Sequence, residues 1–266
     1  MSDIKKSMFQ ISRLEDLSNK NTVIHRIQPS VKFILTVVYL VVIISFSPKQ
    51  LSGLIPFIFF PIVIMVLGDI PYQLLFHRIL IVLPFVLFAG VSNLILDKEI
   101  VFYLWNIGIT GGMVSFCTIL LKTVLTVLAV FLLIATTSMN DLVYVMIRFK
   151  IPSIIVFQIM MTYRYLNVLL LEASTMYHAY ILRAPKEKGI RLKDMGTFLG
   201  QLIIRSFDRG ERIYNAMKCR GFQGELKFSK RDKFTKQEWI YVIIVSGLFL
   251  FLRFVNISKL IGDILI

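Results

Sequence analysis

The sequence predicts an all-α, polytopic membrane protein with about five transmembrane helices and a separate section of long amphipathic helices. Hydrophobic residues make up 56% of the 266 residues, and the mean hydropathy of +0.75 is one that soluble domains rarely reach. Apolar runs long enough to cross a bilayer recur along the chain. The formal net charge of +14 is uneven, because residues 164–236 contain 16 Lys and Arg against 7 Asp and Glu.

The predicted spans are apolar runs separated by polar or basic segments. A helix that crosses a bilayer needs about 20 mainly apolar residues. The runs that approach this length are residues 31–46, 51–67, 79–96, 113–136 and 239–254. Pro56, Pro61 and Pro84 lie inside these runs, and membrane helices tolerate proline where neighbouring groups satisfy the freed carbonyl. We therefore expect five helical spans.

The positive residues predict the orientation. Cytoplasmic loops of membrane proteins are enriched in Lys and Arg, so the basic segments 1–30 and 68–78 and the long stretch after residue 136 are expected in the cytoplasm. The cytoplasmic position of these segments also explains the high positive charge, so nucleic-acid binding is not needed to explain it. Five spans then place the C-terminus outside, and no signal peptide is expected. The segment 97–112 is an expected external loop, and whether residues 100–109 insert as a short hairpin is left open.

Four sections follow from these boundaries. They are a cytoplasmic N-terminal segment (1–30), a transmembrane bundle of about four spans (31–137), a cytoplasmic or interfacial helical section (138–237), and a final transmembrane helix with its tail (238–266). The third section contains a helix over residues 153–182, closed by Pro185, and an amphipathic helical stretch over residues 199–222. Gly221 is the expected stop of the second helix, because glycine adopts a left-handed backbone at no steric cost.

Motifs of the common catalytic and nucleotide-binding sites are absent from the sequence. There is no P-loop, no Gly-x-Ser-x-Gly, no His-Glu-x-x-His and no Cys-x-x-Cys. His25, His77 and His178 are scattered, so no metal site is expected, and Cys117 and Cys219 lie in settings too different for a disulfide. No span carries paired carboxylates. We therefore expect a chain without catalytic residues, bound cofactor or metal.

Several charged residues allow two interpretations. Lys122, in the middle of a span, is either a functional intramembrane charge or a lysine bonded to carbonyls of the bundle. The residues Arg205, Asp208, Arg209, Glu211 and Arg212 share one face of the amphipathic helix, where they are expected to support that helix as a solvated, internally paired set, Asp208 with Arg212. Arg183 and Arg220 are either favourable charges at helix C-termini or docking residues. Their similar positions at the ends of successive helices favour docking.

Two segments of the helical section carry a family resemblance. Residues 206–222, SFDRGERIYNAMKCRGF, resemble the transmembrane T component of energy-coupling factor (ECF) transporters. The segment Leu182-Arg183-Ala184-Pro185, followed by Gly189-Ile190-Arg191, is similar to the cobalt/nickel branch, the CbiQ-like proteins. The resemblance extends over nearly the whole chain.

The resemblance implies a docking role for two helix ends. In the family, two long coupling helices each end in an Ala-Arg-Gly-like motif that docks into a groove of one ATPase subunit, its arginine facing acidic groups. The corresponding residues here are Arg183, Ala184 and Pro185 in one motif and Cys219, Arg220 and Gly221 in the other. Two departures from the pattern are Cys219 in place of alanine and Arg-Ala-Pro in place of Ala-Arg-Gly at the first motif.

The implied function is that of a coupling subunit of an ATP-driven importer for cobalt, in preference to nickel. The implied partners are two ATP-binding cassette ATPases that hold ATP and Mg, a membrane subunit that binds cobalt, a small accessory membrane subunit, and lipid. The expected location is the plasma membrane of a prokaryote. Two alternatives from other classes are a stand-alone permease or channel and a membrane-embedded lipid-modifying enzyme.

Overall fold

The structure is a computed structural model, and it describes residues 15–48, 50–96, 100–104, 107–184, 189–222 and 236–255. Contacts divide the chain into two compact units. We call residues 17–138 and 232–266 the bundle unit, and residues 1–16 and 139–231 the arm unit. The four sections expected from the sequence, and the side of the membrane assigned to each, stay predictions.

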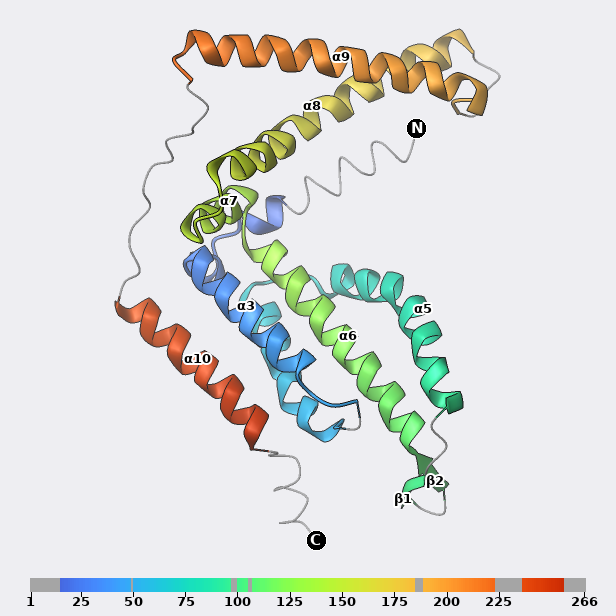
Figure 1. The fold of residues 1–266 in the computed structure, drawn as a ribbon, viewed down its shortest axis with the longest axis vertical. Coiled ribbons are helices and arrows are strands. Elements are labelled where there is room, and N and C mark those ends of the chain that lie inside the picture. The colour runs from blue at the N-terminus through green and yellow to red at the C-terminus, as the bar shows by residue number, and fades with distance from the viewer. Residues whose placement is uncertain are drawn as a thin grey trace. The chain divides into compact units, whose positions relative to one another are not determined.

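Helices dominate the bundle unit (Figure 1). They are α2 (Val23–Arg26), α3 (Pro29–Ile44), the 3₁₀ helix η1 (Ser52–Ile58), α4 (Phe59–Leu67), α5 (Tyr72–Leu96), α6 (Gly111–Thr136) and α10 (Lys236–Phe254). The all-α class is confirmed with one local exception. Strands β1 (Ile100–Leu104) and β2 (Ile107–Thr110) pair antiparallel. The insertion of this segment into the membrane, which the sequence left open, is not decided by the pairing.

Local chemistry explains several helix boundaries in the bundle unit. Pro29 occupies the first turn of α3, where a missing backbone N–H costs nothing. Thr110 precedes α6, and its hydroxyl accepts a hydrogen bond of 3.4 Å from the backbone N–H of Met113, which satisfies one of the unpaired donors of the first turn. Pro56 lies inside η1 and Pro84 inside α5, as membrane helices permit.

The core of the bundle unit is an aromatic cluster where α3, η1, α4 and α10 meet. Tyr39 is fully buried, and its hydroxyl donates a 2.9 Å hydrogen bond to the carbonyl of Phe57. The rings of Tyr39, Phe60 and Phe249 have centroids 4.5–5.4 Å apart, the separation of favourable aromatic pairs. This cluster therefore fixes α10, the last described helix, to elements more than 180 residues earlier in the chain.

Helices α5 and α6 approach each other closely at Gly90. A Cβ atom at this position would lie only 2.4 Å from a ring carbon of Phe116. Small residues permit such close packing between membrane helices, where dispersion contacts replace the hydrophobic effect as the main attraction. A residue larger than glycine at position 90 would collide with the ring of Phe116, so this packing requires Gly90.

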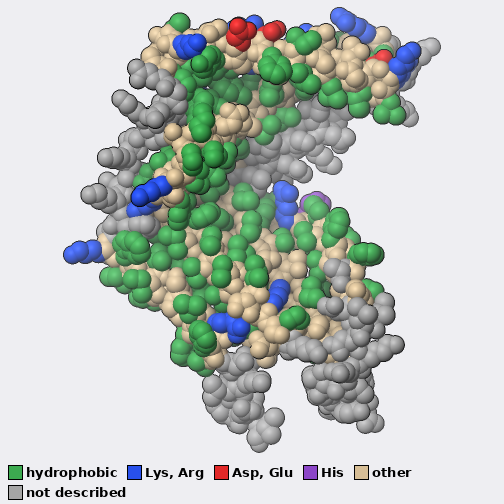
Figure 2. Space-filling model, in the orientation of Figure 1, with side chains coloured by type: hydrophobic (Ala, Val, Ile, Leu, Met, Phe, Trp, Pro, Cys, Tyr) green, Lys and Arg blue, Asp and Glu red, His purple; other side chains and the backbone are tan. Residues whose placement is uncertain are grey.

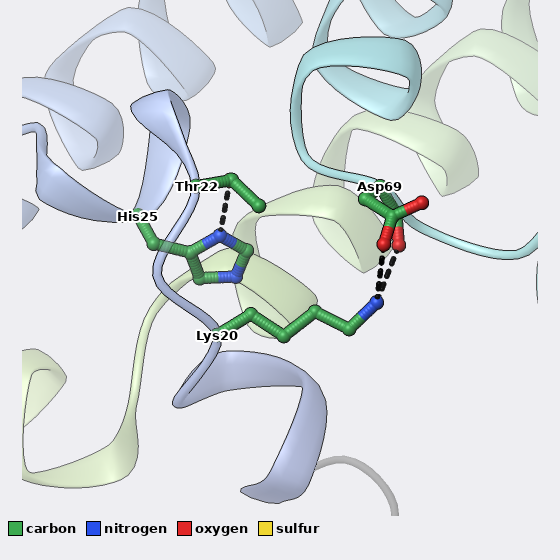
Figure 3. Close-up of polar contacts among 4 residues, drawn as sticks. All are labelled: Lys20, Thr22, His25 and Asp69. Carbon is green, nitrogen blue, oxygen red and sulfur yellow. Dashed lines mark hydrogen bonds and ion pairs between the residues drawn. The ribbon is translucent and has the colours of Figure 1, made fainter.

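Polar contacts hold the segment before α3 against the turn between α4 and α5 (Figure 3). The Nζ of Lys20 donates to the Asp69 carbonyl at 2.7 Å and lies 3.1 Å from Asp69 Oδ2. Asp69 has a φ of 49°, a left-handed conformation in which Asp is enriched among non-glycine residues. Thr22 Oγ1 lies 2.7 Å from His25 Nδ1. The pKa of His25 is lowered, chiefly because burial disfavours the charged ring, and in part because Lys32 and Lys20 are nearby.

The arm unit contains three described helices: α7 (Met139–Arg148), α8 (Ser153–Arg183) and α9 (Leu192–Cys219). Helix α8 ends one residue later than expected. Helix α9 begins at Leu192, seven residues before the expected start at residue 199. Figure 2 shows Lys, Arg and acidic side chains along α9 on the face in view, whereas hydrophobic side chains cover much of the bundle unit.

Length and hydropathy test the predicted spans only in part. Among the described residues, three helices are long and apolar enough to cross a membrane, over Tyr72–Ser92, Gly111–Thr136 and Ser153–Arg183. The segments Pro29–Ile44 and Ser52–Leu67 are shorter apolar helices. The third long helix is α8, whose expected place is the cytoplasmic or interfacial section. The count of five spans stays a prediction.

Candidate functional site: two arginine helix tips

The second tip, Cys219-Arg220-Gly221, is a helix end closed by a glycine. Gly221 has a φ of 81°. Its N–H donates to the Lys218 carbonyl at 2.9 Å, and the N–H of Phe222 donates to the Met217 carbonyl at 3.1 Å. These are the two hydrogen bonds of a Schellman motif, which requires a left-handed residue after the helix. The predicted stop at Gly221 is confirmed, and the motif fixes the backbone at which Arg220 leaves α9.

The first tip ends α8 in a different way. Ala184 follows the helix with φ −128° and ψ 65°, and its N–H donates to the carbonyls of Tyr180 and Ile181 at 3.0 and 3.2 Å. Pro185, the third residue of the predicted docking motif, lies outside the described residues. The side chain of Leu182, beside Arg183, is 82% exposed. The backbone geometry of this tip therefore differs from that of the second.

Both tip arginines are accessible to other molecules. Arg183 and Arg220 are exposed. Among the described residues, neither guanidinium has a hydrogen-bond or ion-pair partner. An exposed guanidinium keeps its five donors available for a carboxylate on another molecule, and Arg matches a carboxylate in a bidentate manner. Each tip thus offers one unpaired positive charge at a defined helix end.

Helices α8 and α9 run antiparallel, and side-chain contacts join them near both ends and in the middle. Near the first tip, the Tyr180 hydroxyl donates a 2.7 Å hydrogen bond to Asp194 Oδ2, in the first turn of α9. At the other end, the ring of Phe222 stacks on Phe157 of α8, with centroids 5.1 Å apart. These two contacts are about 35 Å apart along α8 at the ordinary helical rise. The two arginines therefore lie at opposite ends of one helix pair.

The middle contact of the pair is an ion pair that the sequence analysis missed. Glu172 of α8 lies 2.6 Å from Arg205 Nη1 through one carboxylate oxygen and 3.5 Å from Arg209 Nη2 through the other. We had expected the charges of α9 to pair within their own helix. That expectation is wrong for Asp208 and Arg212, which form no ion pair in the described structure. Arg205 and Arg209 reach across to α8 instead.

The remaining charged residues of α9 are exposed. Asp208, Glu211 and Arg212 lie on the solvated side of the helix. Lys218 lies beside the second tip, and its Nζ is 4.7 Å from the ring centroid of Tyr214, over the ring face. This cation–π contact holds the lysine against α9, whereas Arg220 occupies the C-cap position of the helix.

Lys122 is bonded to the C-terminal end of α3. Its Nζ donates to the carbonyl of Phe46 and lies 3.4 Å from that of Ile44. This geometry matches the interpretation of a lysine bonded to carbonyls of the bundle. A role as a lining or gating residue stays a prediction. Among the described residues, no three His, Cys, Asp or Glu side chains gather in a way that could hold a metal ion.

The class defined by this geometry is a helical membrane protein with a paired-helix arm that presents two basic tips. Comparison with known sequences agrees. The sequence model of the CbiQ family, described as cobalt transport protein, matches residues 20–230, and the chain belongs to this family. The resemblance that residues 182–191 and 206–222 carry is thereby confirmed.

Individual relatives cover most of the chain at low identity. The energy-coupling factor transporter transmembrane protein EcfT of Streptococcus equi is 24% identical over 87% of this chain and 92% of its own. EcfT of Bacillus subtilis is 24% identical over 87% and 94%. An uncharacterized protein of Methanocaldococcus jannaschii is 26% identical over 85% and 81%.

Proposed function

We propose that this chain is the transmembrane coupling subunit of an ATP-driven ECF importer, and that it carries no catalytic residue, cofactor or metal of its own. The observation that carries the proposal is the pair of exposed arginines, Arg183 and Arg220, at opposite ends of the α8–α9 pair. Two separate tips suit two ATPase subunits, one for each tip. The names of the EcfT relatives support a place in such a transporter.

The mechanism that follows is transmission of motion through packed helices. ATP binding would bring two ATPases together and move the groove that holds each tip. The contacts of Tyr180, Glu172 and Phe157 with α9 join the two helices, so a displacement of one tip reaches the other. A separate membrane subunit that holds the substrate would then reorient, because the ATPases bias a two-state element.

We propose cobalt, in preference to nickel, as the substrate. The family description supports an importer of this metal. The metal would be bound by the separate membrane subunit rather than by this chain, which would act in the plasma membrane of a prokaryote. An accessory membrane subunit completes the expected complex.

Co-purification tests the docking role. The tagged chain is expressed with its candidate ATPases and the substrate-binding subunit, as wild type, Arg183→Glu, Arg220→Glu and the control Lys218→Glu. Reversing a charge in a hydrogen-bonded contact costs several kcal/mol, so we expect ATPase recovery to fall about 100-fold for the arginine variants. The control, which reverses a charge on the same helix, should lose much less.

Three results would contradict the proposal. Equal ATPase recovery by all four proteins would make the tips ordinary helix ends. Substrate flux into liposomes that contain this chain alone would favour a stand-alone permease, and turnover of a lipid by the chain alone would favour an enzyme. Comparing the uptake of radioactive cobalt with that of radioactive nickel by the complete complex shows which metal is the substrate.

A further inference from the structure

Two cations from different helices converge on the last turn of α3. Lys122 of α6 donates to the Phe46 carbonyl and lies 3.4 Å from that of Ile44. Arg253 of α10 donates from Nη2 to the Ser45 carbonyl at 3.0 Å and from Nε to the Ser45 hydroxyl at 3.4 Å. Its guanidinium carbon also lies 4.4 Å from the ring centroid of Phe46. Three consecutive residues thus hold two full positive charges.

The negative charge available to these cations within the structure is too small to balance them. The C-terminus of a helix carries the equivalent of about half an elementary negative charge. Among the described residues, every polar partner of Lys122 and Arg253 is a neutral oxygen atom. Charge that is not neutralised is costly in apolar surroundings. The site therefore favours a ligand with a negative charge.

The surroundings of the two cations specify the rest of that ligand. On α3, Ile44 is 68% exposed and Val41, one turn earlier, is also exposed. On α10, Phe254 is 85% exposed and Phe251 is exposed as well. Apolar side chains turned outward on membrane helices contact acyl chains. A ligand with an anionic head and apolar chains, placed where an apolar helix ends, has the chemistry of a phospholipid.

We propose that Lys122 and Arg253 bind the phosphate group of a membrane phospholipid at the C-terminal end of α3. The guanidinium can donate two parallel hydrogen bonds to phosphate oxygens, and the ammonium adds a third donor with its own charge. The acyl chains lie along the exposed side chains of α3 and α10. This binding is independent of the arginine tips.

Three probes separate the parts of the ligand. The purified full-length chain in neutral detergent is titrated with phosphatidylglycerol, with diacylglycerol, which has the chains but no phosphate, and with inorganic phosphate, which has no chains. Retained lipid is counted by native mass spectrometry, and the rise in melting temperature with each probe is recorded. We expect retention and stabilisation with phosphatidylglycerol and at least tenfold weaker effects with the other two.

Variants assign the binding to the two cations. Lys122→Met and Arg253→Gln should each weaken the phosphatidylglycerol effect about tenfold, whereas Lys122→Arg and the arm-unit control Lys218→Met should keep it. The rise in melting temperature with lipid is compared within each variant, because both cations also bond carbonyls and their loss lowers stability without lipid. An unchanged rise in the Met and Gln variants would overturn the proposal, and so would equal retention of diacylglycerol or full competition by inorganic phosphate.

Discussion

Cations lie at helix C-termini in both units of the protein, but with opposite surroundings. In the bundle unit, the Nζ of Lys32 donates to the Thr136 carbonyl at the end of α6, at 2.6 Å, and Lys122 donates to the end of α3. The antiparallel helices α3 and α6 thus each supply a lysine to the other. In the arm unit, the guanidinium groups of Arg183 and Arg220 have no partner among the described residues.

The difference teaches how the same charge serves stability or binding. A cation that a neighbouring helix directs onto a buried carbonyl satisfies an acceptor that would otherwise cost free energy. A cation that belongs to the helix end itself, and extends past it, gains little from its own helix. We therefore expect substitutions in the bundle unit to change stability and substitutions at the tips to change association.

The largest expected effect is on coupled transport. Arg183→Glu combined with Arg220→Glu should lower substrate uptake by the complete complex about 100-fold, because both docking contacts become repulsive. The melting temperature of the isolated chain should stay within about 1 °C of wild type, since exposed charges contribute little to stability. A drop of many degrees in the isolated variant would show that the arginines are structural and remove the contrast between the units.

The second effect is on the stability of the bundle unit. Lys32→Met removes the charged donor to the Thr136 carbonyl and leaves this buried acceptor unsatisfied. The free energy of unfolding should fall by about 1–3 kcal/mol. We expect a lower midpoint in denaturant unfolding of the purified chain, with unchanged ATPase recovery from the fraction that stays folded. Lys218→Met is the matched control, because that lysine is exposed on α9. Equal midpoints for the two variants would contradict the assignment.

A smaller effect is expected at the contact between α8 and α9. Glu172→Gln should weaken the pair by about 0.5–1 kcal/mol, the range of partly exposed ion pairs. Spin labels placed at the two tips should then show a broader distance distribution. The exchange variant Glu172→Arg with Arg205→Glu restores opposite charges and should narrow it again. If the distribution is the same in all three proteins, the ion pair does not hold the helices together.

The smallest effect concerns pH. The pKa of His25 is lowered in the folded chain, so between the folded value and the ordinary value of about 6.5 the unfolded chain binds more protons. The contribution of His25 to stability is complete above pH 6.5 and is lost as the pH falls below it. Thermal unfolding from pH 7.5 to 5 should show this slope, and His25→Gln should reduce it. A slope of the opposite sign would contradict the burial of the ring.

Local rules predicted the parts of the structure that depend on short segments. The left-handed Gly221 and the end of α8, one residue beyond the expected Leu182, follow from glycine and proline near helix ends, and each apolar run became a helix or a pair of helices. The length of α3 was also predicted from its apolar stretch, although the helix begins and ends two residues earlier than expected. These features depend on neighbours within a few residues.

Features that depend on distant residues could not be predicted in the same way. The partner of Arg205 is Glu172, 33 residues earlier, and helix-face spacing alone gives equal support to pairing within α9. The carbonyls that accept from Lys122 lie more than 70 residues away, so the sequence left its role open. One sequence feature indicated that Phe222 packs: an apolar residue often follows the glycine of a Schellman motif and makes a packing contact. The sequence did not identify Phe157 as its partner.

The 3₁₀ segment η1 affects how far a short apolar run can extend. Ser52–Leu67 has too few residues to reach across a bilayer of about 30 Å as an ordinary helix, which would measure about 24 Å. A 3₁₀ helix rises about 2.0 Å per residue rather than 1.5 Å, so winding Ser52–Ile58 more tightly lengthens the element to about 27 Å. Pro56 lies inside this stretch, where an α-helical hydrogen bond could not form. Pro56, although proline usually breaks helices, thus lies in the segment that lengthens this element. Replacing Pro56 by alanine should shorten the element and thin the bilayer around it.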